Sequence, residues 1–239
     1  MQNKTLHIAN IGTIVFVRSR RAKRLNISMK PFQAVRVAIP RGVSYAYAEK
    51  FVYKRLDWIK RHRLRMQEAE NKRTIFDEHT QFATRHHQLH IVRSDSKTLA
   101  VRVGNSTIHV NCPYSIEITA QKVQTTIREG IERAWRKEAK AYLPGRVKAL
   151  AAQHGFTYKQ VFIKNTKTRW GSCSSKNNIN LSLHLMRLPD YLIDYIILHE
   201  LVHTVVKSHG QKFWSLLDKI TGNARKLDAE VKHYDMRIY

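Results

Sequence analysis

The chain has 239 residues, of which 43 are Lys or Arg and 18 are Asp or Glu, so its formal net charge is +25. A hydrophobic fraction of 43% with only nine Gly and five Pro excludes a low-complexity or collagen-like chain. No apolar run approaches the roughly 18 residues that a membrane helix needs, and two cysteines cannot build a disulfide framework. We expect a cytoplasmic globular protein with free thiols, whose charge attracts polyanions.

The first 118 residues are predicted to be basic and β-rich, with one helix. Residues 11–17 are apolar and β-branched, and apolar residues alternate with polar ones at 25–29 and 35–39, which predicts strands. From about residue 44 to about residue 66, apolar residues recur at helical spacing. Five cations follow the first strand, namely Arg18, Arg20, Arg21, Lys23 and Arg24.

Further strands and then a long helix are predicted in the middle of the chain. Residues 82–112 carry strand patterns, with Gly104 and Asn105 as a hairpin turn. From near Thr119 the apolar residues recur at helical spacing as far as Gly155, where the helix is expected to stop. Pro144 is expected to kink or split this helix, because proline lacks the backbone N–H and clashes with the preceding turn.

The change from β to α character near residues 113–119 is the predicted domain boundary. It divides the chain into a basic, β-rich N-terminal region, 1–118, and a second domain, 119–239, which is mainly helical with a small sheet. The predicted fold class is therefore α+β.

A helix that begins near Asp190 carries the motif H-E-x-x-H, as His199, Glu200 and His203. Residues i and i+4 lie one above the other on a helix, so both imidazoles can reach one tetrahedral Zn²⁺. Glu200 is rotated by about 100° from His199 and can reach a metal-bound water without being a ligand. The surrounding residues are strongly apolar, so these side chains need a partner that offsets their desolvation. The structural alternative is a pair of hydrogen-bonded core histidines with Glu200 as a salt-bridge partner.

Two histidine ligands are too few to hold a metal ion stably, so a third ligand is needed. His209 is the nearest candidate, but a continuous helix would carry it off the metal face. The chain must therefore turn between Val206 and Gly210, which Lys207, Ser208 and Gly210 permit. The rival ligands are His184, His233, Asp228 and Glu230.

Several motifs in order resemble the YgjP-like metallopeptidases, which are relatives of the SprT-like and minimal gluzincin-type zinc proteases. The resemblance covers about residues 14 to 225. In the C-terminal half it rests on Arg169-Trp170-Gly171-Ser172-Cys173-Ser174, residues 178–181, Leu188-Pro189, Asp194-Tyr195, the H-E-x-x-H motif, His209, Phe213 and Trp214. In the N-terminal half it rests on residues 21–30, residues 35–43 and Asp57-Trp58-Ile59.

The resemblance implies a zincin-like metallopeptidase domain over 119–239, with His199, His203 and His209 as zinc ligands and Glu200 as catalytic acid/base. The chain departs from the family at one position, where Ser208 precedes the third histidine and the family often has Asn.

The predicted function is a zinc metallopeptidase in which Glu200 activates a zinc-bound water to attack a peptide carbonyl. Residues 178–183 are either an edge strand that pairs with an extended substrate or an ordinary core strand. Arg169 is expected to be a surface or structural ion-pair residue rather than an oxyanion ligand. The predicted partners are protein or peptide substrates, with nucleic acid at the basic surface and no membrane. The alternative function is a basic nucleic-acid-binding protein with a structural zinc site and no hydrolysis.

Overall fold

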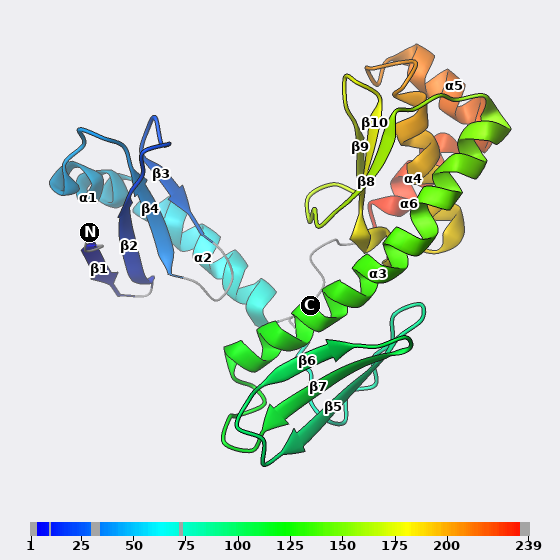
Figure 1. Cartoon of the computed structure of the whole chain (residues 1–239). Helices are drawn as coiled ribbons and strands as arrows, with labels where there is room; N and C mark the ends of the chain where they lie inside the picture. Colours follow the sequence, from blue (N-terminus) through cyan, green and yellow to red (C-terminus); the bar gives the residue numbers. More distant parts are fainter. Residues whose placement is uncertain (1–3, 10, 30–33, 72–73, 235–239) are drawn as a thin grey trace. The chain divides into compact units, whose positions relative to one another are not determined.

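The chain divides into two compact units, Met1–Thr74 (unit 1) and Ile75–Ile238 (unit 2). The structure, a computed structural model, describes residues 4–9, 11–29, 34–71 and 74–234. Figure 1 shows unit 1 in blue and cyan and unit 2 in green to red.

Unit 1 combines a mixed sheet with two helices, and its core follows from strand alternation. The sheet order is β1-β2-β4-β3, with β2 and β4 parallel and the outer pairs antiparallel. Buried side chains of the sheet, such as Phe16 and Val37, pack against Ala48 and Val52 of the first helix. The elements are β1 (Lys4–Ile8), β2 (Gly12–Arg18), β3 (Asn26–Ser28), β4 (Val35–Ile39), α1 (Tyr45–Lys54) and α2 (Leu56–Asn71).

The helix predicted for residues 44–66 is divided in the structure. Ser44 caps α1 by accepting a hydrogen bond from the Tyr47 N–H at 3.2 Å. Arg55, with φ of −110° and ψ of 13°, ends α1 and separates it from α2.

Unit 2 contains two three-stranded sheets and four α-helices among its described residues. The first sheet has the order β5-β7-β6, and the second has the order β8-β10-β9. The predicted hairpin between β6 and β7 is confirmed. Its turn is displaced by one residue, because the Gly104 N–H donates to the Thr107 carbonyl at 2.8 Å and leaves Asn105 and Ser106 at the tip. The elements are β5 (Gln88–Ser94), β6 (Ala100–Val103), β7 (Thr107–Pro113), α3 (Gln121–His154), β8 (Gln160–Lys164), β9 (Gly171–Cys173), β10 (Asn178–Ser182), the 3₁₀-helix η1 (Leu183–Arg187), α4 (Asp190–Val202), α5 (Gln211–Thr221) and α6 (Ala224–Val231).

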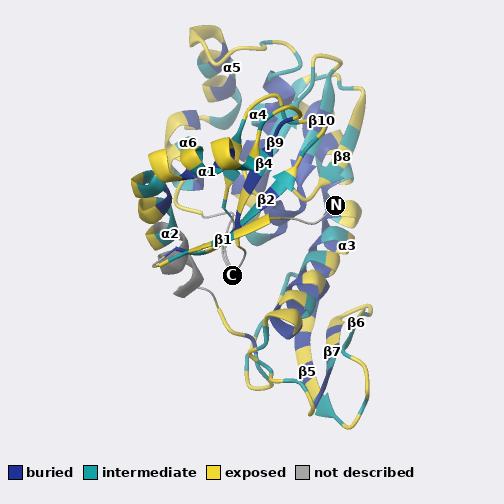
Figure 2. Ribbon diagram, turned by 90° about the vertical axis from the view of Figure 1, so that its left-hand side faces the viewer, coloured by how far each residue is buried: buried dark blue, intermediate teal, exposed yellow. Residues whose placement is uncertain are grey.

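The 34-residue helix α3 joins the two sheets of unit 2. Its N-terminal half packs on β6 and β7, and further along it contacts η1, β8 and α4 (Figure 1). Gly130 allows the close approach to the first sheet, since a Cβ there would lie 2.4 Å from the Val101 side chain. Buried and exposed bands alternate along α3 (Figure 2), as an amphipathic helix requires.

The sequence predicts that Pro144 kinks or splits this helix. The split is wrong, because α3 is one helix from Gln121 to His154. Leu143 and Val147 on either side of Pro144 are fully buried, and this packing holds the helix together across the missing N–H. Gly155, with φ of 72°, ends the helix where the sequence predicted.

The boundary of the compact units differs from the one that the sequence predicted. The units meet between Thr74 and Ile75, whereas the sequence placed the boundary between residues 118 and 119. The change from strands to helix falls inside unit 2, because the sheet β5-β7-β6 buries its apolar face on α3. A change in secondary structure therefore does not coincide with a break in packing. Within the described residues, no helix combines the length and apolar character needed to span a membrane.

Candidate metal centre

The helix α4 is buried in the core of unit 2. Pro189 precedes it with φ of −63°, and Asp190 lies in its first turn, where the helix dipole favours a negative charge. Its buried residues lie on several sides of the helix, as expected of an element enclosed by others. The predicted helix start and its buried character are both confirmed.

His199 lies in the last turn of α4 and His203 caps its C-terminus. The Val206 N–H donates to the Val202 carbonyl at 2.8 Å, and the chain then turns before α5 begins. The turn that the sequence predicted at this point is confirmed. It brings His209 back toward the two histidines of α4.

The three imidazoles converge on one point. His209 Nε2 lies 3.0 Å from His199 Nε2 and 3.1 Å from His203 Nε2, and the candidate ligand atoms all lie within 4.8 Å of one another. Around a tetrahedral centre with Zn–N bonds of 2.0–2.1 Å, ligand nitrogens are separated by about 3.3 Å. The two separations from His209 Nε2 are close to that value.

The protonation of the rings also fits a cation at the centre. His203 Nδ1 lies 3.0 Å from the Val206 carbonyl, which can only accept, so this nitrogen carries the proton and Nε2 of the neutral ring has a lone pair. His209 Nε2 then faces two ring nitrogens, and a single proton cannot serve both contacts. A metal ion accepts all three lone pairs at once, and the carbonyl of Val206 fixes the ring as second-shell partners of metal ligands do.

Burial keeps the rings in the neutral form that binds metals. The pKa of His199 is lowered to about 4, first by burial and then by the neighbouring His203 and His209. Burial also lowers the pKa of His203. Because protonation competes with metal binding, both shifts favour a ligating imidazole at neutral pH.

Phe213 of α5 packs against all three rings. Its ring centroid lies 4.8 Å from that of His199, 4.5 Å from that of His203 and 4.7 Å from that of His209. This contact fixes the rotamers of the imidazoles, which is a condition for a precise site. Residue-by-residue reasoning did not find this role, although Phe213 belongs to the motifs that carry the family resemblance.

Glu200 lies beside the cluster and is 6% exposed. Its Oε2 is buried without a hydrogen-bond partner in the described part of the chain. Strand β9 packs on it so closely that a Cβ on Gly171 would lie 2.7 Å from Glu200 Oε1. Only glycine at position 171 leaves room for this carboxylate. The only sequence signal that connects the two residues is their common place in the family motifs.

Burial raises the pKa of Glu200 to about 8, while the backbone N–H of Cys173 and the charge of Arg169 act in the opposite direction. A carboxyl group kept out of water with one oxygen unpaired is typical of a group that exchanges a proton. A cation held by the neighbouring imidazoles would lower this pKa again.

The rival ligands lie elsewhere. Tyr195 donates to Asp228 Oδ1 at 3.5 Å, and Tyr191 donates to Glu230. His184 is fully buried and its Nε2 lies 3.0 Å from Asn165 Oδ1. His233 is exposed after α6. None of these four belongs to the group of side chains described above.

The edge strand beside the site is β9, and residues 178–182 lie in the middle of the sheet. Residues 178–182 form β10, the central strand of its sheet, so of the two predicted alternatives the core strand is confirmed. The edge strand is β9, and it packs on α4. The sequence alone predicts a polar loop rather than a strand at residues 171–173. Cys112 and Cys173 are free thiols, as predicted.

Comparison with known proteins agrees with this geometry. The family model described as "YgjP-like, metallopeptidase domain" matches residues 23–234. The chain therefore belongs to the YgjP-like metallopeptidase family. This match favours the peptidase over the alternative of a basic nucleic-acid-binding protein, which receives no support.

Solved structures of two metallopeptidase zymogens are similar to part of the chain. Jannalysin from Methanocaldococcus jannaschii is 23% identical over 38% of this chain and 93% of its own, with a TM-score of 0.34. Abylysin from Pyrococcus abyssi is 21% identical over 37% of this chain and 90% of its own, also with a TM-score of 0.34. No curated protein matches the chain.

Proposed function

We propose that this metallopeptidase is a zinc enzyme in which His199, His203 and His209 hold the metal and Glu200 is the general base and acid. The convergence of three Nε2 atoms beside a buried, unpaired carboxylate carries this proposal. Three imidazole ligands suit zinc, and three protein ligands leave a fourth position for water or substrate, as in catalytic zinc sites.

Zinc, when bound, supplies a Lewis acid that polarises the scissile carbonyl and lowers the pKa of water. Glu200 then accepts the proton of the attacking water and delivers it to the leaving amine. Its position fits this role, because it follows the ligand His199 directly and points from the same helix turn without belonging to the ligand set. The peptide groups of β9 and Phe213 exclude water from this side of the carboxylate and the rings.

The substrate of such a site is a protein or a peptide. The edge strand β9, rather than residues 178–183, is the strand that can pair with an extended substrate. Its backbone contacts Glu200 at Gly171, and its outer edge is unpaired in the sheet order β8-β10-β9. An extended substrate can therefore pair with β9 and bring its scissile bond beside Glu200. The two free cysteines fit a reducing compartment such as the cytoplasm.

The Glu200→Gln variant tests the role of the carboxylate. We expect it to retain about one zinc per chain and to lose peptide hydrolysis by about 10²- to 10⁴-fold, the usual contribution of a general acid–base group. Hydrolysis is measured by mass spectrometry on a mixture of peptides, with zinc content measured on the same samples. Glu230→Gln is the matched control, since Glu230 lies on α6 and contacts Tyr191 instead. Equal cleavage by the Glu200 variant would exclude the proposed role.

A further inference from the structure

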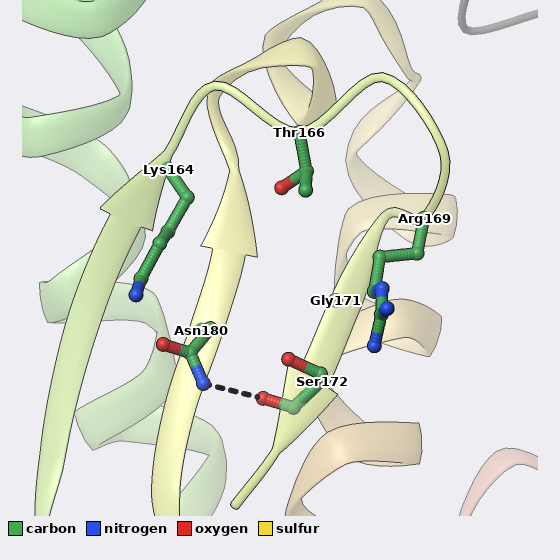
Figure 3. Close-up of a pocket in the computed structure, with 6 residues that line it drawn as sticks. All are labelled: Lys164, Thr166, Arg169, Gly171, Ser172 and Asn180. Carbon is green, nitrogen blue, oxygen red and sulfur yellow. Dashed lines mark hydrogen bonds between the residues drawn. The ribbon is translucent and has the colours of Figure 1, made fainter. Parts of the chain in front are cut away.

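A small pocket lies on the sheet β8-β10-β9, and we call it the basic pocket. Its volume is about 200 Å³. Figure 3 shows side chains from β8, the following loop, β9 and β10 gathered around it. The lining residues are Lys164, Thr166, Arg169, Gly171, Ser172 and Asn180.

The pocket carries positive charge without an acidic residue. Two of its six lining residues are cations, Lys164 and Arg169, and none is Asp or Glu. Arg169 is exposed and forms no ion pair with any residue that the structure describes. Two hydroxyl groups, those of Thr166 and Ser172, add further hydrogen-bond donors. Such a set of donors favours a small anionic group.

The loop that forms one side of the pocket is held at several points. Asn165 donates to Glu132 of α3 at 2.7 Å, and Lys167 forms an ion pair with the same carboxylate at 2.6 Å. The Thr166 carbonyl, between these two anchors, accepts from the Ser182 hydroxyl at 2.7 Å. The backbone of this loop is therefore fixed before any ligand binds, which reduces the entropy lost on binding.

The floor of the pocket is equally fixed. Asn180 donates through Nδ2 to the Ser172 carbonyl at 3.2 Å, across the pair β9–β10 (Figure 3). The small Ser172 side chain leaves the space between the two cations open. Neither cation fills it, as Lys164 lies along the pocket side and Arg169 hangs from the loop end of β9 (Figure 3).

The pocket and the metal centre share strand β9. Gly171 lines the pocket and is also in contact with Glu200, and the positive charge of Arg169 acts on that carboxylate. Side chains alternate between the two faces of a strand, so Ser172 and its partner Asn180 lie on the face opposite to the one on which Gly171 meets Glu200. A substrate paired with β9 alternates in the same way, so the residue next to the one that faces Glu200 is directed to the face that carries the pocket. The charge of the pocket is thus placed to act on substrate choice.

We propose that the basic pocket binds a carboxylate of the peptide substrate, one or two residues from the scissile bond. This inference rests on the proposed function, because it treats β9 as the strand along which the substrate lies. The enzyme then prefers peptides with a free C-terminus or an acidic side chain at that position over neutral peptides of the same shape. Arg169 and Lys164 are the residues that determine this preference.

Binding is tested first, because it does not depend on turnover. The zinc-loaded full-length protein is titrated with acetyl-Ala-Ala-Ala as the free acid and as the amide, and with acetyl-Ala-Glu-Ala-amide and acetyl-Ala-Gln-Ala-amide, and amide resonances are followed by NMR. We expect an acidic peptide to bind about tenfold more tightly than its neutral partner, and its shifts to centre on the pocket. Preference for the free acid shows that the pocket binds the C-terminal carboxylate, and preference for the Glu peptide shows that it binds a side-chain carboxylate.

Pocket variants separate this site from direct binding to the metal, which also attracts carboxylates. Lys164→Gln is the main variant, because Lys164 lies on β8 away from the loop that leads into β9. It should lower the affinity for the acidic peptide by about threefold to tenfold and leave the affinity for the neutral peptide unchanged. Arg169→Gln should do the same, and Arg169→Lys should restore part of the preference. Lys176→Gln removes a nearby exposed charge outside the pocket and should have no effect.

Two results overturn the inference. One is equal binding of acidic and neutral peptides by the wild-type protein, and the other is an unchanged preference in both Lys164→Gln and Arg169→Gln. Failure of the proposed function looks different. In that case the zinc-loaded protein cleaves no peptide while binding in the pocket still depends on Lys164, so the pocket remains a carboxylate site without hydrolysis.

Discussion

Replacing Gly171 by alanine tests the contact between β9 and Glu200. The new Cβ would lie 2.7 Å from Glu200 Cγ and Oε1 and 2.9 Å from Cδ. Non-bonded carbon atoms prefer separations of 3.5–4.0 Å, so the carboxylate or the strand must move by about 1 Å. Glu200 is 6% exposed and sits between β9 and α4, so it has little room to move.

Overpacking of this kind costs about 1–3 kcal/mol of the free energy of unfolding. Displacing a catalytic group by about 1 Å reduces activity by about 10²-fold. We therefore expect Gly171→Ala to be less stable by this amount and nearly inactive. It should retain its zinc, because the atoms that the new Cβ meets first all belong to Glu200. Stability is measured by denaturant unfolding of the zinc-loaded protein, and activity and zinc content are measured on the same preparation.

Gly145→Ala is the matched control. Gly145 lies inside α3, and a Cβ there would meet nothing within 4 Å. Alanine in an exposed helix position should stabilise the protein by about 0.5–1 kcal/mol. If Gly171→Ala were as stable and as active as the wild-type protein, the close packing of β9 on Glu200 would be refuted.

Two further predictions concern stability. Burial lowers the pKa of His184 from 6.5 to about 4. The unfolded state therefore takes up a proton at higher pH than the folded state does. Between pH 8 and pH 5, the free energy of unfolding should fall by about 2 kcal/mol because of this residue. His184→Asn should lose that part of the pH dependence, and an identical pH profile in denaturant titrations would refute it. Asp194→Asn breaks the bidentate pair with Arg146, at 2.6 and 2.5 Å, between α4 and α3, and should cost about 1–2 kcal/mol. Breaking the exposed pair of Glu129 and Arg133 by Glu129→Gln should cost less than about 0.5 kcal/mol, and equal losses would contradict the difference.

The sequence predicts the convergence of the three histidines because its determinants are local. The spacing of His199 and His203 places both on one helix face, and the apolar residues around them predict burial. The turn before His209 is predicted because the chain must turn back for a third imidazole to reach His199 and His203. Choosing His209 over rivals such as Glu230 needed the family resemblance, because nothing in the sequence shows that Tyr191 contacts that carboxylate.

The features that the sequence missed depend on contacts between distant segments. Strand β9 has three residues in a polar stretch, and it exists because it pairs with β10 and packs on α4. Its register determines that Gly171 faces Glu200. Pro144 remains inside α3 because buried neighbours outweigh a local preference. In the same way, the boundary between the compact units depends on which helix covers the sheet β5-β7-β6.

The most direct test of the three-histidine site is zinc affinity in the His209→Ala variant. It is measured by competition with a chromophoric chelator, beside the wild-type protein and His233→Ala. His233 is an exposed histidine and a rival ligand on the sequence alone, so it is the matched control. We expect about one zinc per chain in the wild-type protein and the control, and an affinity lower by roughly 100-fold or more in His209→Ala, because losing a ligand costs at least as much as losing a second-shell partner. A zinc affinity of His209→Ala equal to that of the wild-type protein would contradict the assignment of His209 as a ligand.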